Sequence, residues 1–304
     1  MNIITGHKGF VGVNLTSFFK KRNKAIVGAS RTPNGSEVSY QELNIALFNK
    51  AKSCIHLAGK AHDLKKTSED QEYFVVNTEL TKTLFDHFLK SECEVFIYMS
   101  SVKAAADEVE VKLTEDVTPK PVTVYGKSKL AAEEYILSKE IPENKRVYIL
   151  RPCMIHGPNN KGNLNLLYSF VAKGIPYPFG KYENKRSFVS VENLCFIINE
   201  LIENKSISSG IYNIADDTSL STTKLVEIIG QVIQKPAKIL HTPKYIVNTI
   251  AKVGDVLPLP INSERVQKLT ENYVVSNAKI KKAIKKELPL TTEKGIEITI
   301  ASFL

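Results

Sequence analysis

Long apolar runs are missing from this 304-residue chain. No stretch approaches the ~18–20 apolar residues that a membrane-spanning helix needs, so we expect no membrane span. The N-terminal MNIITGHKGF lacks the charged and then apolar profile of a signal peptide. The four cysteines, Cys54, Cys93, Cys153 and Cys195, are widely spaced without a CxxC pair, so neither a metal site nor a disulfide framework is expected. A reducing cytoplasm is the expected location.

A concentrated basic face is also missing, although the formal net charge is +9. The lysines are scattered, as at 18–24 and 279–286, and no basic stretch is interleaved with aromatic residues as in single-strand binders. The amphipathic run at 279–286 is typical of a solvated helix face. We therefore expect no nucleic-acid partner, and a phosphate-bearing small molecule is the partner that this charge favours.

Internal repeats are absent, and the first half of the chain alternates apolar runs with helical patterns. The order of these elements is typical of an α/β fold, a Rossmann-type doubly wound parallel sheet. The apolar runs predict buried strands at 2–5, 25–30, 53–58, 95–100 and 146–152. The helical patterns lie at about 10–22, 41–50, 70–90 and 124–139.

After about residue 157 this alternation becomes irregular. Segments 157–163 and 173–185 are rich in Gly, Pro and Asn and are expected to be loops. Helical patterns at about 190–204 and 221–234 then flank a strand-like segment at 210–216.

These patterns divide the chain into two interwoven parts. We expect a dinucleotide-binding Rossmann domain at 1–160. A smaller, mainly substrate-binding part follows at 161–304, with segments at about 186–216 returning to the Rossmann core.

Three glycines follow the first predicted strand in ITGHKGFVG: Gly6, Gly9 and Gly12. This GxxGxxG is a variant of the dinucleotide fingerprint, in which glycine permits a tight turn and a close approach of backbone to pyrophosphate. The N–H groups at the start of the next helix would then hold the phosphates. The position after a strand and before a helix favours this reading over a structural turn.

The end of the second strand bears on the choice of cofactor. An acidic residue there would bind the ribose 2′-hydroxyl of NAD, but this chain has Ser30 and Arg31. An arginine suits the 2′-phosphate of NADP, unless Arg31 stacks on the adenine or points to solvent. We expect NAD or NADP as cofactor, and Arg31 favours NADP slightly.

The string TVYGKSK places Tyr125 and Lys129 four residues apart on one helix face. Such a pair is common on solvated helix faces, but here Ser100 and Ser101 end the preceding strand, at the edge where open α/β sheets bind ligands. A nearby ammonium, together with the positive nicotinamide, would lower the pKa of Tyr125 and favour its phenolate. Tyr125 could then take a proton from a sugar hydroxyl while hydride leaves for the nicotinamide, with Ser101 bonded to the same oxygen.

The chain resembles the extended short-chain dehydrogenase/reductase family, in its nucleotide-sugar epimerase/dehydratase branch. The motifs that carry the resemblance lie mostly in residues 1–160, in the family's order, and continue more weakly through NKRSFVSVENL at 184–194. They are TGHKGFVG, HLAG, NT at 77–78, MSS, YGKSK, LRP and HGP.

The resemblance implies roles for individual residues. The catalytic residues would be Ser101, Tyr125 and Lys129. The cofactor contacts would be Gly6, Lys8, Gly9, Phe10, Gly12, Arg31, Leu57, Ala58, Gly59, Asn77, Tyr125 and Lys129, with Lys60 nearby. The substrate contacts would be Ser101, Val102, Tyr125, Asn163 as the cap of a short helix, Arg186 on the diphosphate, and Arg265 or Lys268 as a second cation. The alternative for Asn77 is a cap at the start of a helix. The alternative for Arg265 and Lys268 is a position on the surface without a role in binding.

Departures from the family pattern limit which reactions of the family are expected. Val102 and Lys103 stand where a dehydratase has two carboxylates, which disfavours dehydration. His156 replaces the usual tyrosine before GP, and we expect it to line a pocket or pack rather than act as a base. Ser187 and Asn193 stand where the family usually has acidic residues, and the serine after Arg186, together with KGNLNLL before it, resembles a bacterial surface-polysaccharide subgroup.

The predicted function is an NAD(P)-dependent UDP-hexose or UDP-N-acetylhexosamine 4-epimerase that passes through a 4-keto intermediate. An NADPH-dependent UDP-4-keto-sugar reductase is the close alternative, and a non-catalytic dinucleotide sensor is a remote one. The resemblance also implies a homodimer through the helices near 70–90 and 124–139.

Overall fold

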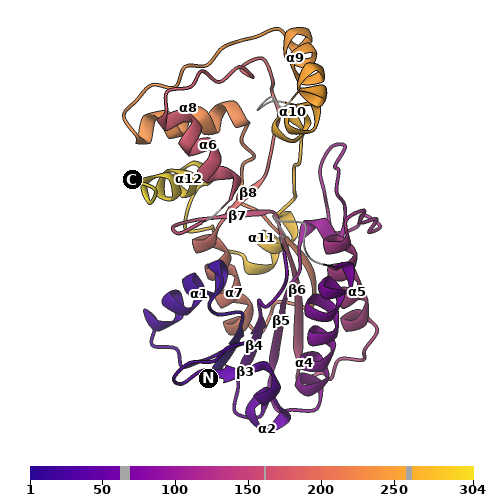
Figure 1. Cartoon of the computed structure of the whole chain (residues 1–304). Coiled ribbons are helices and arrows are strands. Elements are labelled where there is room, and N and C mark those ends of the chain that lie inside the picture. Colours follow the sequence, from indigo (N-terminus) through magenta and orange to yellow (C-terminus); the bar gives the residue numbers. More distant parts are fainter. Residues whose placement is uncertain (62–68, 161, 258–261) are drawn as a thin grey trace.

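Seven parallel strands form one sheet in the lower half of the molecule (Figure 1). The computed structural model describes residues 1–61, 69–160, 162–257 and 262–304. The strand order β3-β2-β1-β4-β5-β6-β9 runs outward in both directions from the junction of β1 and β4, a topological switch point where such sheets bind ligands. The strands are β1 Asn2–Thr5, β2 Ile26–Ser30, β3 Val38–Ser39, β4 Ser53–His56, β5 Val95–Met99, β6 Arg146–Pro152 and β9 Gly210–Ile214. The predicted Rossmann-type fold is confirmed.

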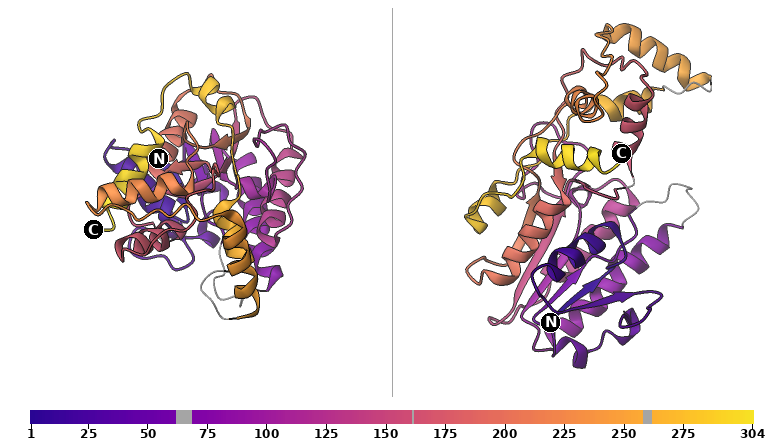
Figure 2. Two further views of the ribbon diagram at one scale, coloured as in Figure 1. Left: turned by 90° about the horizontal axis from the view of Figure 1, so that it is seen from above. Right: turned by 90° about the vertical axis from the view of Figure 1, so that its left-hand side faces the viewer.

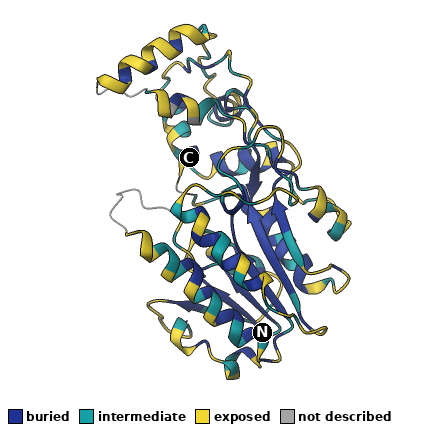
Figure 3. Ribbon diagram, turned by 90° about the vertical axis from the view of Figure 1, so that its right-hand side faces the viewer, coloured by how far each residue is buried: buried dark blue, intermediate teal, exposed yellow. Residues whose placement is uncertain are grey.

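Helices cover both faces of this sheet, as the continuous apolar strands require. One face carries α1 Phe10–Lys20, α7 Val191–Glu203 and α11 Ala278–Ile284, and its core includes Phe19, Ile198 and Ile280. The other face carries α2 Ile45–Phe48, α3 Asp70–Phe74, α4 Leu80–Leu89 and α5 Val124–Leu137, with a core that includes Phe48, Phe85 and Ile136. Figure 3 shows the strands between these layers as mostly buried.

Two predicted helices are interrupted. The helix expected at 41–50 is a 3₁₀ turn, Tyr40–Glu42, followed by the short α2, because Asn44 Oδ1 accepts from Leu47 N at 3.1 Å and begins a new helix. The helix expected at 70–90 contains a π-helical turn at Val75–Glu79 between α3 and α4. Such turns are rare and often mark functional sites.

A smaller lobe begins where β6 ends. It contains a parallel pair, β7 Met154–His156 and β8 Phe188–Ser190, and its own core around Phe179, Val226 and Ile296. Its helices are α6 Asn163–Ala172, α8 Thr222–Val232, α9 Lys244–Val256, α10 Ser263–Thr270 and α12 Thr292–Ala301. Figure 2 shows this lobe stacked on the sheet-containing part, with α9 at the end opposite the N-terminus.

No helix in the described ranges is long and apolar enough to cross a membrane.

Candidate active site

The glycine loop after β1 leaves room for backbone only. A Cβ on Gly6, which has a φ of +66°, would lie 2.8 Å from Ala58 N, and one on Gly12 would lie 2.3 Å from Gly6 O. Helix α1 then begins at Phe10, and Gly9 at its N-cap has no side chain to accept from the first helical N–H groups. A tight turn with uncapped helix donors fits the diphosphate of a dinucleotide.

The end of β4 lies against this loop and is held by buried polar side chains. Thr5 Oγ1 lies 2.7 Å from His56 Nδ1 and accepts from Ala58 N at 3.1 Å, while His56 Nε2 lies 2.9 Å from Thr81 Oγ1. Burial first, and Lys129 second, lowers the pKa of His56 to about 3. The imidazole is therefore neutral at physiological pH, and it fixes the Leu57–Gly59 segment beside the glycine loop.

Asn77 holds the next part of the loop from within the π-helical turn. Its Oδ1 accepts from Lys60 N at 2.7 Å, and its Nδ2 donates to Lys60 O at 3.0 Å and to Ser128 Oγ at 2.9 Å. The alternative role of a helix-start cap is wrong, because Asn77 lies inside a helical stretch. Lys60 itself forms an ion pair with Glu72.

Ser101 and Tyr125 meet where β5 ends and α5 begins. Ser101 follows the strand closely and caps a 3₁₀ turn, Val102–Ala104, by accepting from Lys103 N at 3.2 Å. Tyr125 lies in the first turn of α5, close enough for Ser101 to lower the pKa of its phenol. A Cβ on Gly126 would lie 2.3 Å from Lys103 O, so this glycine permits the close approach.

Lys129 lies one turn further along α5 and is almost completely buried, at 4% exposure. Its Nζ donates to Met99 O at 2.8 Å and lies 4.9 Å from the centre of the Tyr98 ring. A Cβ on Gly59 would lie 3.0 Å from this Nζ and from Asn77 Oδ1. The structure thus brings Lys129, Gly59 and Asn77 together beside the Ser101–Tyr125 pair.

Lys129 by itself does not lower the pKa of Tyr125, whereas the expectation also included the positive charge of the nicotinamide. Burial raises the pKa of Tyr125, and Ser101 opposes this rise. Lys129 does not contribute because its ammonium bonds the carbonyl of Met99 rather than the phenol. Burial also lowers the pKa of Lys129 to about 8, with Glu133 opposing.

The lowered pKa of Lys129 predicts a pH dependence of stability. Up to about pH 8 the folded and unfolded chains both protonate Lys129, and the folded chain bears the full cost of burying the charge. Between pH 8 and 10.5 the unfolded chain binds more protons, so this cost is relieved and stability rises with pH. We expect Lys129→Met to be more stable than the wild type at about pH 7, by about 1–3 kcal/mol, with the advantage shrinking toward pH 10. Urea unfolding of both proteins between pH 7 and pH 10 measures this difference in stability. A difference that stays constant with pH would contradict the prediction.

A buried ion pair behind the site was missed at the sequence level. Glu133, completely buried on α5, bonds Ser100 Oγ and accepts from Arg151 Nε at 3.0 and 3.1 Å and from Arg151 Nη2. Arg151 Nη1 has no hydrogen-bond partner among the described residues. This pair ties β5, α5 and β6 together directly under Ser101 and Lys129. The signal was an arginine inside an otherwise apolar strand, since a buried charge requires a partner.

An acidic residue near the end of β2 was also missed. Glu37 Oε1 lies 2.8 Å from His7 Nε2, and its Oε2 lies 2.6 Å from Lys8 Nζ and accepts from Asn34 N at 2.8 Å. Lys8 first, and His7 second, lowers the pKa of Glu37 to about 2, so its carboxylate is charged. Arg31 is exposed directly after β2. Positively and negatively charged side chains therefore both lie beside the glycine loop.

The residues expected to bind substrate are spread over the lobe junction. Arg186 Nη1 lies 3.4 Å from Glu271 Oε1, and the Arg186 backbone bridges Tyr273, whose hydroxyl donates to Ala106 O at 2.7 Å. Because Lys103 Nζ lies 4.6 Å from the centre of the Tyr273 ring, Arg186 is linked to the loop after Ser101. The side chains of Arg265 and Lys268 lie outside the described residues.

The structure contradicts two further expectations about substrate contacts. Asn163 is the exposed first residue of α6, and the cap is made instead by Asn165, whose Oδ1 accepts from Gly162 N at 2.9 Å. Val102 is 5% exposed, and its side chain is part of the core between the sheet and α1 and α7.

His156 is a packed residue. Its side chain is fully buried, its Nδ1 lies 2.8 Å from Thr299 Oγ1, and its ring meets the edge of Phe188. It links β7 to α12 and does not join the Ser101–Tyr125 pair.

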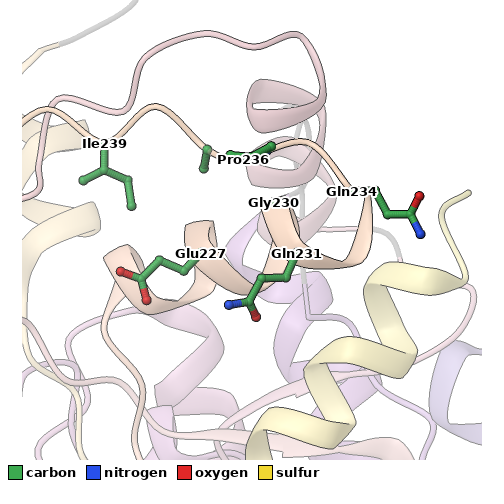
Figure 4. A pocket seen from close by; sticks show the side chains of 7 residues that line it. Glu227, Gly230, Gln231, Gln234, Pro236 and Ile239 are labelled. Carbon is green, nitrogen blue, oxygen red and sulfur yellow. The ribbon is translucent and has the colours of Figure 1, made fainter.

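A surface hollow on the small lobe is separate from this site. It lies between α8 and the segment after it and is lined by Glu227, Gly230, Gln231, Gln234, Pro236, Ala237 and Ile239 (Figure 4). None of these residues belongs to the constellation around Tyr125, and we assign the hollow no role.

The parallel sheet, the glycine loop and the Ser101–Tyr125–Lys129 constellation define a dinucleotide-dependent enzyme of the α/β class. The chain belongs to the NAD dependent epimerase/dehydratase family, whose model matches residues 2–215.

Three known proteins illustrate this membership. The chain is 28% identical to a UDP-glucose 4-epimerase of Vibrio cholerae, over 99% of this chain and 95% of that protein. It is 26% identical to an N-acetyl-α-D-glucosaminyl-diphospho-ditrans,octacis-undecaprenol 4-epimerase of Escherichia coli O157:H7, over 92% and 84%. The solved UDP-N-acetylglucosamine 4-epimerase from Bacillus cereus shares the fold, with a TM-score of 0.77 at 18% identity, over 98% and 97%.

Proposed function

We propose that the protein is an NAD(P)-dependent nucleotide-sugar 4-epimerase that acts on a UDP-hexose or UDP-N-acetylhexosamine. The observation that carries this proposal is that the end of β5 with Ser101 and the start of α5 with Tyr125 approach closely at the carboxyl edge of the sheet, with Lys129 buried beside them. The full-length similarity to a UDP-glucose 4-epimerase supports the choice of reaction.

The position of each residue in the site indicates its role in the proposed reaction. The glycine loop and the start of α1 would hold the dinucleotide diphosphate, and Gly59 and Asn77 border the space beside Lys129. When bound, the nicotinamide supplies a reversible hydride acceptor for the C4 carbon of the sugar. Tyr125 takes the C4 hydroxyl proton and later returns it, and Ser101 donates a hydrogen bond to the same sugar oxygen. Lys129 adds positive charge and donors at the same edge, and Arg186 contacts the substrate diphosphate.

The protonation states agree with this scheme. The raised pKa of Tyr125 means that the unliganded enzyme holds a neutral phenol, which can donate as well as accept. The near-neutral pKa of Lys129 makes its charge sensitive to neighbouring charge. Proton transfer is thus coupled to the charges brought by the ligands.

The cofactor preference is set by opposing charges. Lys8 and Arg31 favour the 2′-phosphate of NADP. The charged carboxylate of Glu37 forms an ion pair with Lys8 and repels that phosphate. We expect Glu37→Gln to raise the affinity for NADP⁺ relative to NAD⁺ roughly tenfold, and Arg31→Gln to lower it. Dissociation constants for both dinucleotides measure this, and an unchanged ratio in both variants would contradict it.

A second substrate class is a hexose joined through a diphosphate to a lipid carrier. The exposed apolar side of α9 favours it, and one relative is named for such a substrate.

The reaction is tested by incubating the purified protein with UDP-hexoses and separating the C4 epimers. Interconversion without added reductant supports epimerisation. Stoichiometric consumption of NADPH with a 4-keto sugar would instead make the protein a reductase.

A homodimer remains a proposal. α4 and α5 pack side by side on one face of the sheet, as a shared four-helix interface requires. Sedimentation velocity at several protein concentrations tests it, and a monomer throughout would contradict it.

A further inference from the structure

Helix α9 is apolar on two sides, and only one side is packed. Val247, Ala251 and Gly254 are buried, and they recur at helical spacing. This side faces α10 and joins the core of the small lobe, where Val247 and Ala251 lie in one cluster with Val266. Packing within the chain therefore accounts for this side of the helix.

A second side, next to the buried side of the helix, presents an apolar stripe to solvent. Its residues recur at intervals of four, three and four, which places them in one line along the helix, and the last of them directly follows the final helical residue. They are Ile246, Ile250, Val253 and Leu257, between 37% and 52% exposed, and Tyr245 and Val256 widen the stripe at 71% and 85% exposure. Single exposed apolar residues are ordinary, but a contiguous group marks an interaction surface. Figure 3 shows this mostly exposed helix at the upper end of the molecule.

The surroundings of the stripe are basic. Lys252 is exposed on α9 on the same side as Tyr245 and Val256, and Lys244 is exposed at the first residue of the helix. The two segments that form this end of the lobe, 173–185 and 235–257, contain seven lysines and two acidic residues, Glu183 and Asp255. Asp255 is bonded to Ser263 through its N and Oγ at 2.9 and 2.6 Å.

The two segments are joined in space, so their charges act together. Phe179 bridges His241, Tyr177 bridges Ile239, and Lys244 Nζ lies 5.3 Å from the centre of the Tyr182 ring. The end of the lobe thus combines an apolar stripe with a surplus of positive charge.

We propose that α9 docks the protein onto an anionic phospholipid surface. The stripe, widened by Tyr245 and Val256, enters the boundary between headgroups and acyl chains, and Lys252 and the other lysines at this end of the lobe contact lipid phosphates. The helix has 13 residues, which suits lying on a bilayer and is too short to span one. α9 belongs to the small lobe, which also contains Arg186. Membrane docking does not depend on the proposed reaction.

The test is co-sedimentation of the full chain with vesicles. Vesicles of phosphatidylglycerol and phosphatidylethanolamine in equal amounts are compared with pure phosphatidylcholine. We expect binding to the anionic vesicles, a loss of roughly tenfold or more in partition coefficient for Ile250→Ser/Val253→Ser, and roughly tenfold for Lys244→Gln/Lys252→Gln. Salt is expected to weaken the binding of the wild type more than that of the lysine variant.

Matched controls separate docking from misfolding and from dimerisation. Val13→Ser/Leu304→Ser removes two exposed apolar side chains, 51% and 78% exposed, outside α9 and is expected to bind vesicles like the wild type. Dinucleotide binding and circular dichroism confirm that each variant is folded. Absence of binding to anionic vesicles would overturn the proposal. A serine variant of α9 that changes from dimer to monomer without losing vesicle binding would overturn it too, since a second copy would then cover the stripe. Vesicle binding by a chain without epimerase activity would support docking while refuting the proposed reaction.

Discussion

Replacing Tyr125 by phenylalanine is expected to lower kcat for C4 epimerisation by about 10²–10⁴-fold, the usual contribution of a positioned acid–base group. The substitution removes one hydroxyl from a side chain in the first turn of α5. Because the ring remains, the fold and the affinity for substrate are expected to change little. Steady-state kinetics on the purified variant, with KM and kcat determined separately, measure the effect.

A matched control lies on the same helix. Tyr135 donates its hydroxyl to Asp86 Oδ1 at 2.6 Å and takes no part in the site, so Tyr135→Phe is expected to keep kcat near that of the wild type. Equal activity of Tyr125→Phe and the wild type would remove Tyr125 from the mechanism. A large loss in both variants would instead point to general damage to α5.

The substitution Glu133→Gln is expected to lower the free energy of unfolding by about 3–5 kcal/mol, because it leaves the guanidinium of Arg151 buried without a counter-charge. Both side chains are essentially inaccessible, at 0% and 2% exposure. The loss should be visible as a lower midpoint of urea unfolding at neutral pH. Since Glu133 also bonds Ser100, next to Ser101, activity in the folded fraction is expected to fall as well.

Two comparisons isolate the charge effect. The exposed neighbour Glu134→Gln is expected to change stability by less than about 0.5 kcal/mol. The double variant Glu133→Met/Arg151→Met is expected to recover much of the loss, because replacing both charges leaves neither one unpaired. A cost below about 1 kcal/mol for Glu133→Gln would show that the pair is not a major determinant of stability.

Much of the sheet could be predicted because its strands are buried on both faces. Runs such as 95–100 are continuously apolar, and β5 is found at Val95–Met99. The position of the glycine loop could also be predicted, because the positive φ of Gly6 and the close approach of backbone at Gly12 leave no room for a side chain. The meeting of Ser101 and Tyr125 followed from topology, because the carboxyl ends of parallel strands share one edge.

Other features depended on tertiary contacts that spacing does not reveal. Glu37 reaches the glycine loop only because the turn after β2 folds back, so no fixed distance from the glycines identifies it. The environment of Tyr125 was misjudged because Lys129 reaches Met99 O instead of the phenol. The helical period of α9 shows two apolar sides, but only packing shows that one of them is uncovered.

The central claim is that hydride leaves C4 of a nucleotide-linked hexose and returns to the same carbon while Tyr125 handles the hydroxyl proton. The most direct measurement uses a UDP-hexose deuterated at C4, incubated with the enzyme without added reductant, followed by mass spectrometry of the separated epimers. We expect the product epimer to retain the deuterium at C4. Loss of the label to solvent, or formation of product only when NADPH is consumed stoichiometrically, would contradict this account.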